Sequence, residues 1–280
     1  MKIVKIKGGL GNQLFQYAFI KYLEKLTQNE VYADKNMYQN YLIRNFELNK
    51  IDRNLKYTSE TKEFKFGGFL YKISVLIKAL LKKGYYLEGI SKYKKLLECE
   101  YYDGYWQDLK YINEVEKELK QIFKNKSFFD KKNKIEEDSV AIGFRRGDYL
   151  NKKNKKIYEE CPLFYYKEAI TLIKEKIKKP VFYIFSDDIK SIKNEIETLL
   201  KGEKYFYINE DKENSPLEEL VIMSKCSNAI IPNSTFSWWG AWLSENKNKI
   251  VIVPQYWYKS NEIVKFIPKE WISMDNRRHS

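Results

Sequence analysis

Arg145 and Arg146 stand side by side directly after an apolar run, residues 139–144, in a chain whose basic residues are otherwise almost all lysine. Six arginines occur among 51 basic residues. A guanidinium group binds two phosphate oxygens at once in a geometry that a lysine ammonium cannot match. The pair therefore predicts a phosphate-binding site, with a structural ion pair to nearby carboxylates as the alternative.

Small or polar residues also follow the other predicted strands. Gly8, Gly9, Gly11 and Asn12 follow the strand over 2–7. A glycine turn before a helix lets backbone N–H groups approach a phosphate, although a tight turn without a ligand explains it as well. Ser234 or Thr235 can cap the helix that follows the strand over 228–234 and offer N–H groups to an anion. In that helix, Trp238, Trp239 and Trp242 are predicted to lie in the core.

Two adjacent carboxylates, Asp187 and Asp188, follow Ser186 at the end of the strand over 180–186. Adjacent side chains on an extended chain point to opposite faces, so one of them is expected to face a site. That carboxylate either accepts hydrogen bonds from a guanine edge or caps the next helix. No metal is predicted here.

Histidine and cysteine usage excludes several chemistries. The single histidine, His279, lies beside the C-terminus. A Ser-His or Cys-His pair and a histidine-ligated metal are therefore not expected, and acid-base work falls to carboxylates or tyrosines. The three cysteines are far apart without a CxxC pair, which argues against a disulfide framework and a zinc site.

Strands alternate with helices of about a dozen residues from position 138 onward, the pattern of a parallel sheet covered on both faces. Helices are expected over 162–178, 189–200, 215–226 and 235–245. Earlier in the chain a strand, a glycine turn and a helix begin a first α/β unit. Further helices are expected over 67–84 and 109–125. The charged stretch 125–138 predicts a junction between domains at 1–130 and 131–280.

The formal net charge of +13 indicates an anionic partner: a nucleotide, a phospholipid surface or a nucleic acid. The lysines are spread along the chain rather than clustered, which argues against nucleic acid. The first residues lack the apolar run of a signal peptide, and no stretch is apolar enough to span a bilayer. A cytoplasmic location is therefore expected.

Five segments, in this order, resemble the bacterial and animal α-1,2-fucosyltransferases, which transfer L-fucose from GDP-fucose to a galactoside hydroxyl. The resemblance implies a GT-B-like fold, two Rossmann-like α/β domains facing across a cleft, with the acceptor at the first domain and GDP-sugar at the second. It also implies inverting chemistry without a metal or other cofactor. The matching segments are GGLGNQLFQYA (8–18), DGYWQDLKYI (103–112), RRGDYL (145–150), FSDD (185–188) and LVIMSKCSNAIIPNSTFSWWGAWL (220–243).

By motif position, Arg145 and Arg146 would hold the GDP phosphates and neutralise the departing diphosphate. Asp148 is either the catalytic base or the group that orients Arg145, and both interpretations stay open. The remaining residues implied in donor binding are Gly9, Gly11, Asn12, Ser186, Asp187, Asp188, Asn233, Ser234, Thr235 and Ser237.

This chain departs from the family at two positions. Gly143 and Asn228 stand where the family commonly has histidine. These departures leave open another GDP-sugar as donor, or a nucleotide-sugar-binding relative without activity. The acceptor implied by the resemblance is a galactose-containing surface glycan such as an O-antigen or capsule unit. The basic, apolar run 69–83 could bring the enzyme to an anionic inner leaflet that carries lipid-linked acceptors; an ordinary packed helix is the alternative.

Overall fold

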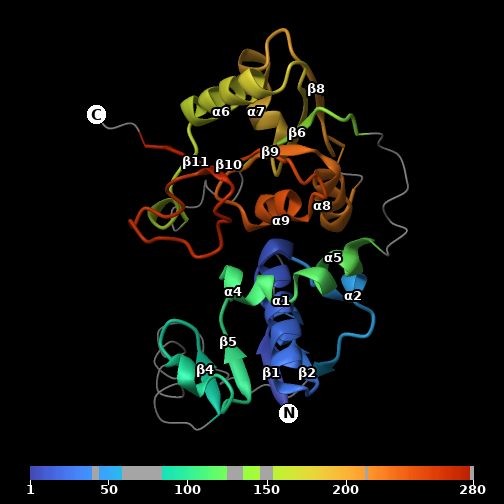
Figure 1. Cartoon of the computed structure of the whole chain (residues 1–280), viewed down its shortest axis with the longest axis vertical. Helices are drawn as coiled ribbons and strands as arrows, with labels where there is room; N and C mark the ends of the chain where they lie inside the picture. Colours follow the sequence, from blue (N-terminus) through green and yellow to red (C-terminus); the bar gives the residue numbers. More distant parts are fainter. Residues whose placement is uncertain (40–43, 59–83, 125–134, 146–153, 212–213, 278–280) are drawn as a thin grey trace. The chain divides into compact units, whose positions relative to one another are not determined.

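The computed structural model describes residues 1–39, 44–58, 84–124, 135–145, 154–211 and 214–277. The chain divides into two compact units, Met1–Asn125 and Lys126–Ser280, so the division lies within the charged stretch 125–138. Each unit has its own sheet in which every described strand pair is parallel. The predicted class of two Rossmann-like α/β units is therefore confirmed (Figure 1).

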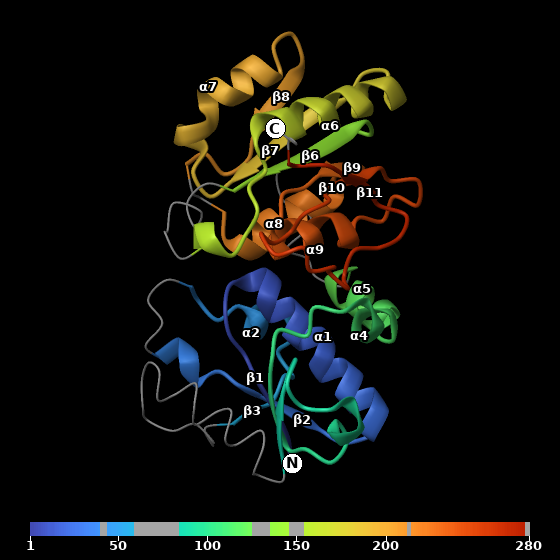
Figure 2. The same ribbon diagram turned by 90° about the vertical axis from the view of Figure 1, so that its left-hand side faces the viewer.

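The N-terminal sheet has the strand order β3-β2-β1-β5-β4. Helix α1 begins after the glycine turn and ends at Thr27, where the left-handed backbone of the C-cap Gln28 stops the helix. It lies against β1 and β2 (Figure 2). The elements are β1 (Lys2–Lys5), α1 (Leu10–Thr27), β2 (Val31–Asp34), η1 (Asn36–Gln39), α2 (Leu48–Ile51), β3 (Tyr57–Thr58), β4 (Tyr85–Leu87), η2 (Tyr93–Lys95), β5 (Tyr101–Asp103), α4 (Leu109–Asn113) and α5 (Glu116–Lys124).

The sequence predicted this unit less well than the other. Strands β2 to β5 are two to four residues long, too short to show an alternating pattern. The single helix predicted over 109–125 is wrong, because the chain breaks it into α4 and α5. At the break, the N–H of Val115 donates to the carbonyl of Ile112, three residues back, instead of four. The ammonium of Lys25 donates to the carbonyl of Glu114. The helix predicted over 67–84 falls almost wholly outside the described residues.

The C-terminal sheet has the strand order β11-β10-β9-β6-β7-β8. Helices α6 and α7 cover one face of this sheet, and α8 and α9 cover the other (Figure 1). The predicted alternation is confirmed except for β11, which the sequence did not indicate. The elements are β6 (Ser139–Phe144), η5 (Asn154–Lys156), α6 (Leu163–Lys176), β7 (Val181–Ser186), α7 (Ile189–Leu199), β8 (Lys204–Tyr207), α8 (Pro216–Lys225), β9 (Asn228–Ile230), α9 (Thr235–Leu243), β10 (Val251–Pro254) and β11 (Ile272–Met274).

Strands β6 and β9 are neighbours at the centre of this sheet although α6 to α8 separate them in sequence. From β6 the chain builds outward to β7 and β8, and from β9 it builds outward the other way to β10 and β11. The connections that follow β6 and β9 therefore leave toward opposite faces of the sheet. In a doubly wound sheet this is where a crevice opens beyond the carboxyl ends of the strands.

Local sequence explains how the helices beside β9 begin. Helix α8 starts with a capping box: Ser215 accepts from the N–H of Glu218, whose carboxylate accepts from the N–H of Ser215.

Helix α9 carries the three tryptophans. Trp238 and Trp239 are fully buried and Trp242 is nearly so, which confirms their predicted place in the core. In the described parts of the chain, no helix is both long and apolar enough to cross a bilayer.

Helix α9 ends on a lysine from the following turn. The ammonium of Lys249 donates to the carbonyls of Ala241, Trp242 and Ser244 at 2.8, 3.0 and 2.9 Å. The last carbonyls of a helix have no partner within the helix and carry partial negative charge. One cation therefore stabilises the end of the helix that begins at the central crevice.

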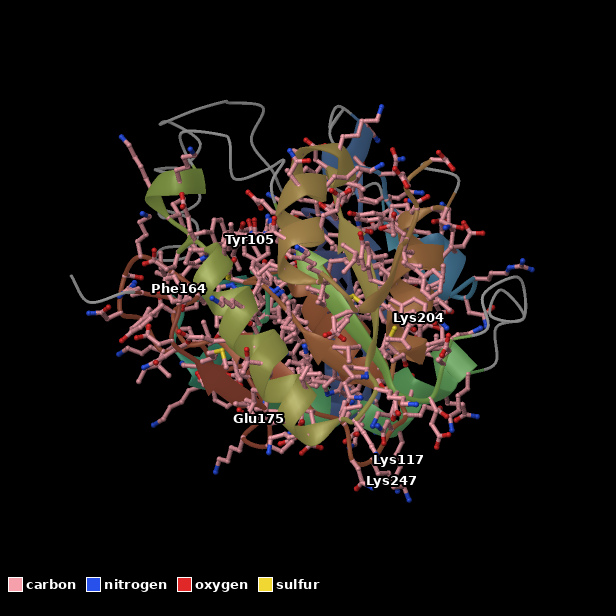
Figure 3. The ribbon with its side chains drawn as sticks, turned by 90° about the horizontal axis from the view of Figure 1, so that it is seen from above. Tyr105, Lys117, Phe164, Glu175, Lys204 and Lys247 are labelled. Atoms are coloured by element: carbon pink, nitrogen blue, oxygen red, sulfur yellow. The ribbon has the colours of Figure 1, made fainter. Side chains whose placement is uncertain are left out.

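We expect Lys249→Met to lower the free energy of unfolding by about 1–3 kcal/mol, because three carbonyls lose a charged donor. Urea denaturation measures the change. Lys247→Met is the matched control, since Lys247 is exposed in the same turn (labelled in Figure 3) and should change stability by less than about 0.5 kcal/mol. Equal effects of the two variants would contradict the capping role.

Candidate active site

Arg145 lies at the carboxyl ends of β6 and β9, the two central strands of the C-terminal sheet, where a doubly wound sheet is expected to bind its ligand. It directly follows β6, and its Nη1 donates to the backbone carbonyl of Asn233, after β9, at 3.2 Å. Its guanidinium carbon lies 5.6 Å from the ring centroid of Tyr158. The structure thus joins two segments that the sequence predicted to act together. Arg146 and Asp148 lie outside the described residues, and their roles stay predictions.

Asn233 uses its side chain to hold this arrangement. It is 1% exposed, and its amide donates to the carbonyls of Glu159 at 2.6 Å and Trp257 at 2.9 Å. Since these bonds occupy the amide nitrogen, we expect Asn233 to serve a donor site chiefly by fixing Arg145. The same loop is held by Asn276, which donates to Glu160, and by Arg277, which pairs with Glu159 at 2.6 Å.

The start of α9 borders the same crevice. Ser234 is the N-cap, and its hydroxyl accepts from the N–H of Ser237 at 3.4 Å. Thr235 is the first helical residue. The N–H groups of a first helical turn and the helix dipole both favour an anion. A guanidinium and a helix N-terminus, two groups that favour an anion, therefore lie at the same end of β6 and β9.

Gly143 has no room for a side chain. A Cβ atom placed on it would lie 2.7 Å from the hydroxyl of Ser237 and 2.8 Å from Cδ of Pro232. In this chain Ser237 and Pro232 fill the space into which a side chain at position 143 would extend. Ser237 is itself 5% exposed, so this space is part of the packed interior.

Asn228, the second position where the resemblance implies a histidine, lies at the amino end of β9. It pairs in register with Val140, whereas Arg145 follows the opposite end of β6. Its side chain donates to the carbonyl of Ser139 at 3.3 Å and accepts from the N–H of Ile250 at 2.9 Å. Asn228 therefore ties strands together at the edge of the sheet remote from Arg145.

The two carboxylates after β7 differ in role. Asp188 is the N-cap of α7 and accepts from the N–H of Ser191 at 3.3 Å, while its own N–H donates to the hydroxyl of Ser186 at 3.0 Å. Asp187 is exposed. Capping gives Asp188 a structural role, and the predicted contact of Asp187 with a nucleotide stays a prediction.

Glu219, in the first turn of α8, was not predicted. Burial raises its pKa to about 7, the hydrogen bond from Asn209 opposes the shift, and the negative charge of Asp187 adds to it. The buried carboxyl of Glu219 therefore lies within electrostatic reach of Asp187, at the end of β7. The sequence does not predict this raised pKa, because an acidic residue in the first turn of a capped helix is common.

The glycine turn of the N-terminal unit is built by buried carboxamides. Gly8 has a φ of +84°, and its carbonyl accepts from Gln13 at 3.1 Å and from Tyr38 at 2.6 Å. Gly9 is the N-cap of α1 and Gly11 is buried in its first turn, while Asn12 accepts from Gln107 at 3.0 Å. Arg44, which the sequence did not single out, lies beside the turn: its Cδ and Nε would be 3.7 Å from a Cβ on Gly9.

Comparison with known proteins decides the family, because the sequence matches Glycosyl transferase family 11 over residues 1–275. The chain belongs to this family. An Escherichia coli alpha-1,2-colitosyltransferase is 31% identical over 98% of this chain and 98% of its own length. The Escherichia coli O-antigen biosynthesis glycosyltransferase WbnK is 30% identical over 96% and 99%.

More distant similarities were also found. A galactoside alpha-(1,2)-fucosyltransferase 1 from Alouatta belzebul is 25% identical over 49% of this chain and 38% of its own length. Among solved structures, an Arabidopsis thaliana FUT1 mutant in complex with GDP covers 90% of this chain and 70% of its own, with 10% identity and a TM-score of 0.48. As a member of family 11, the chain is a glycosyltransferase.

We expect Gly143→Ala to lower the free energy of unfolding by about 1–3 kcal/mol, because the methyl group must displace Ser237 and Pro232. Urea denaturation measures the loss. The double variant Gly143→Ala/Ser237→Ala removes one of the two close contacts and should recover part of it. Wild-type stability for Gly143→Ala would show that the space is not filled.

Glu219→Gln tests the raised pKa. The wild-type carboxyl favours its protonated form in the fold, so its stabilising contribution is complete below its ordinary pKa of 4.5 and is lost as pH rises through about 7. Glutamine stays neutral, so the variant should gain about 1–3 kcal/mol relative to wild type between about pH 5 and about pH 8. Thermal melts at both pH values measure this. The exposed Glu262→Gln is the control and should show no such gain; an equal response would contradict the raised pKa.

Proposed function

We propose that this chain transfers L-fucose from GDP-fucose to the 2-hydroxyl of a galactoside in a surface glycan. The observation that carries the proposal is the position of Arg145, held by Asn233 beside the start of α9 at the junction of β6 and β9. Membership of family 11 and the similarity to O-antigen and alpha-1,2-linking transferases supply the reaction class.

In this reaction the acceptor oxygen bonds to the anomeric carbon as the bond from that carbon to the phosphate oxygen breaks, with inversion. Negative charge then grows on the departing GDP. The guanidinium of Arg145 and the N–H groups of α9 are fixed before reaction, so they can stabilise this charge without reorganising. Arg146 would add a second guanidinium. This arrangement does for the diphosphate what a metal ion does elsewhere, so we propose that no metal or other cofactor is required.

The acceptor hydroxyl must lose a proton to a base. Asp148 is one candidate for that base, and orienting Arg145 is its alternative role. Asp187 is proposed to accept hydrogen bonds from the guanine edge, since Asp188 is used as a helix cap.

Colitose is the second candidate donor sugar. The supporting observation is the 31% identity, over nearly the whole chain, to an alpha-1,2-colitosyltransferase. Gly143 leaves another GDP-sugar open as well, because Ser237 and Pro232 fill the space of a larger side chain at this position. GDP-colitose and GDP-fucose would share the diphosphate site, so the donors must be compared directly.

The remaining proposals concern where the protein works. The expected acceptor is an O-antigen or capsule unit, lipid-linked at the inner face of the cytoplasmic membrane, with the protein in the cytoplasm. The stretch 69–83, proposed to contact that membrane, lies outside the described residues. Liposome co-sedimentation that survives mutation of its lysines to glutamate would exclude the contact.

The test is transfer from labelled GDP-fucose, and in parallel from GDP-colitose, to a panel of β-galactosides with and without EDTA. Arg145→Ala should lower kcat/KM about a hundredfold or more, because a preorganised donor to the leaving group is lost. Arg145→Lys should recover only part, since it keeps the charge but not the fork. Arg53→Ala, at an exposed arginine of the N-terminal unit, is the matched control and should keep wild-type activity.

Each part of the proposal has its own contrary result. Loss of transfer in EDTA would refute the metal-independent reaction. Transfer of colitose but not fucose would move the assignment to the second donor. Binding of GDP without transfer of either sugar would identify a nucleotide-sugar-binding relative.

A further inference from the structure

The turn that follows β5 in the N-terminal unit is strained and firmly held. Trp106 has a φ of +58°, a left-handed conformation that is strained for a non-glycine residue. Glu88 fixes it, because its carboxylate accepts from the N–H of Trp106 at 3.0 and 3.1 Å and from the N–H of Tyr105 at 2.6 Å. Strain of this kind persists where surrounding contacts determine the conformation, and it concentrates at functional sites.

The strained turn sends two adjacent aromatic rings into different environments. The ring of Trp106 is fully buried and stacks on Phe19, with centroids 3.7 Å apart and planes within 5°. Tyr105 remains 43% exposed (labelled in Figure 3). The buried indole anchors the turn, so the tyrosine ring is displayed from a rigid base.

The displayed ring lies at the carboxyl edge of the sheet, where β1 and β5 are neighbours. The ammonium of Lys7, just beyond β1, lies 4.6 Å from the centroid of Tyr105. Gln16, which is fully buried, joins the two strand ends by donating to the carbonyls of Lys7 at 3.2 Å and Gly104 at 3.4 Å. One carboxamide therefore fixes the spacing between the tyrosine and the lysine.

Charges around the turn balance. Asp103 is buried and pairs with Lys7 at 2.5 Å and Lys5 at 3.4 Å. With the carboxylate of Glu88, these four side chains sum to zero formal charge. Lys7, the cation beside the ring of Tyr105, is thus compensated by Asp103, which suits a neutral polar ligand better than a diphosphate.

Neutral hydrogen-bonding groups lie on the next residues. Gln107 donates to Asn12 at 3.0 Å, which links the turn after β5 to the first turn of α1. An exposed aromatic ring followed two residues later by a carboxamide matches a sugar, whose ring has an apolar face of C–H groups bordered by hydroxyls. A tyrosine offers the complementary apolar body and polar tip.

We propose that Tyr105 is the stacking platform of an acceptor-sugar subsite in the N-terminal unit, with Lys7 and Gln107 hydrogen-bonding the hydroxyls of a galactoside. This inference rests on the proposed function, because it assigns the acceptor of that reaction to named residues. The subsite selects a neutral pyranose by its apolar face. It leaves the GDP moiety to the C-terminal unit.

The test varies the galactoside at saturating donor. Tyr105→Ala and Tyr105→Leu should raise the acceptor KM about tenfold, as expected for loss of an aromatic contact. Tyr105→Phe should stay near wild type because the ring is kept. The donor KM and GDP affinity should stay unchanged in all three variants, and thermal melts check that each is folded. Tyr93→Ala removes another exposed tyrosine of the same unit and should not alter the acceptor KM.

Saturation-transfer NMR with the free β-galactoside provides a readout that needs no turnover. Wild type should bind the sugar and Tyr105→Ala should not. An unchanged acceptor KM and unchanged sugar binding in folded Tyr105→Ala would overturn the inference while leaving the transferase assignment intact. Absence of transfer by wild type, with sugar binding still lost in Tyr105→Ala, would refute the proposed function and support the subsite.

Discussion

The buried side chain of Asn233 is the constraint on which the C-terminal crevice depends. Its amide joins the loop at Glu159 to the loop at Trp257, and its backbone carbonyl receives Arg145. A buried amide without partners would cost free energy, so these bonds favour one arrangement of the surrounding loops. The guanidinium of Arg145, which we propose to bind the diphosphate, is thereby held by a residue of the interior of the unit.

In the N-terminal unit, other buried carboxamides hold the loops at the strand ends. Gln13 and Gln16 are fully buried on α1. Gln13 binds the glycine turn and the segment at Asn45, and Gln16 binds the ends of β1 and β5. Both glutamines belong to the segment GGLGNQLFQYA, whose glycines form the turn. The glutamines hold this turn and the neighbouring strand ends in place.

The two departures from the family acquire different meanings in the fold. Asn228 bonds to neighbouring strands at the edge of the sheet remote from Arg145, so its side chain is structural. Gly143 is next but one to Arg145, and Ser237 and Pro232 occupy the space of its missing side chain. In sequence both positions look like losses of a functional histidine. The strand register distinguishes them: Asn228 lies at the end of the sheet remote from Arg145, and Gly143 lies at the end near it.

The sequence by itself determined the two α/β units, most elements after residue 138, and the strand ends where polar groups gather, because long periodic segments and terminal caps are local signals. Tertiary structure decided which strand ends meet: β6 beside β9, which brings Arg145 to Asn233, and β1 beside β5, which brings Lys7 to Tyr105. Tertiary structure also produces the raised pKa of the buried Glu219 and the strained turn at Trp106, neither of which a local sequence pattern predicts. The physical reason is that strand order and burial are set by contacts between segments distant in the chain, and these contacts fix charge environments and backbone strain.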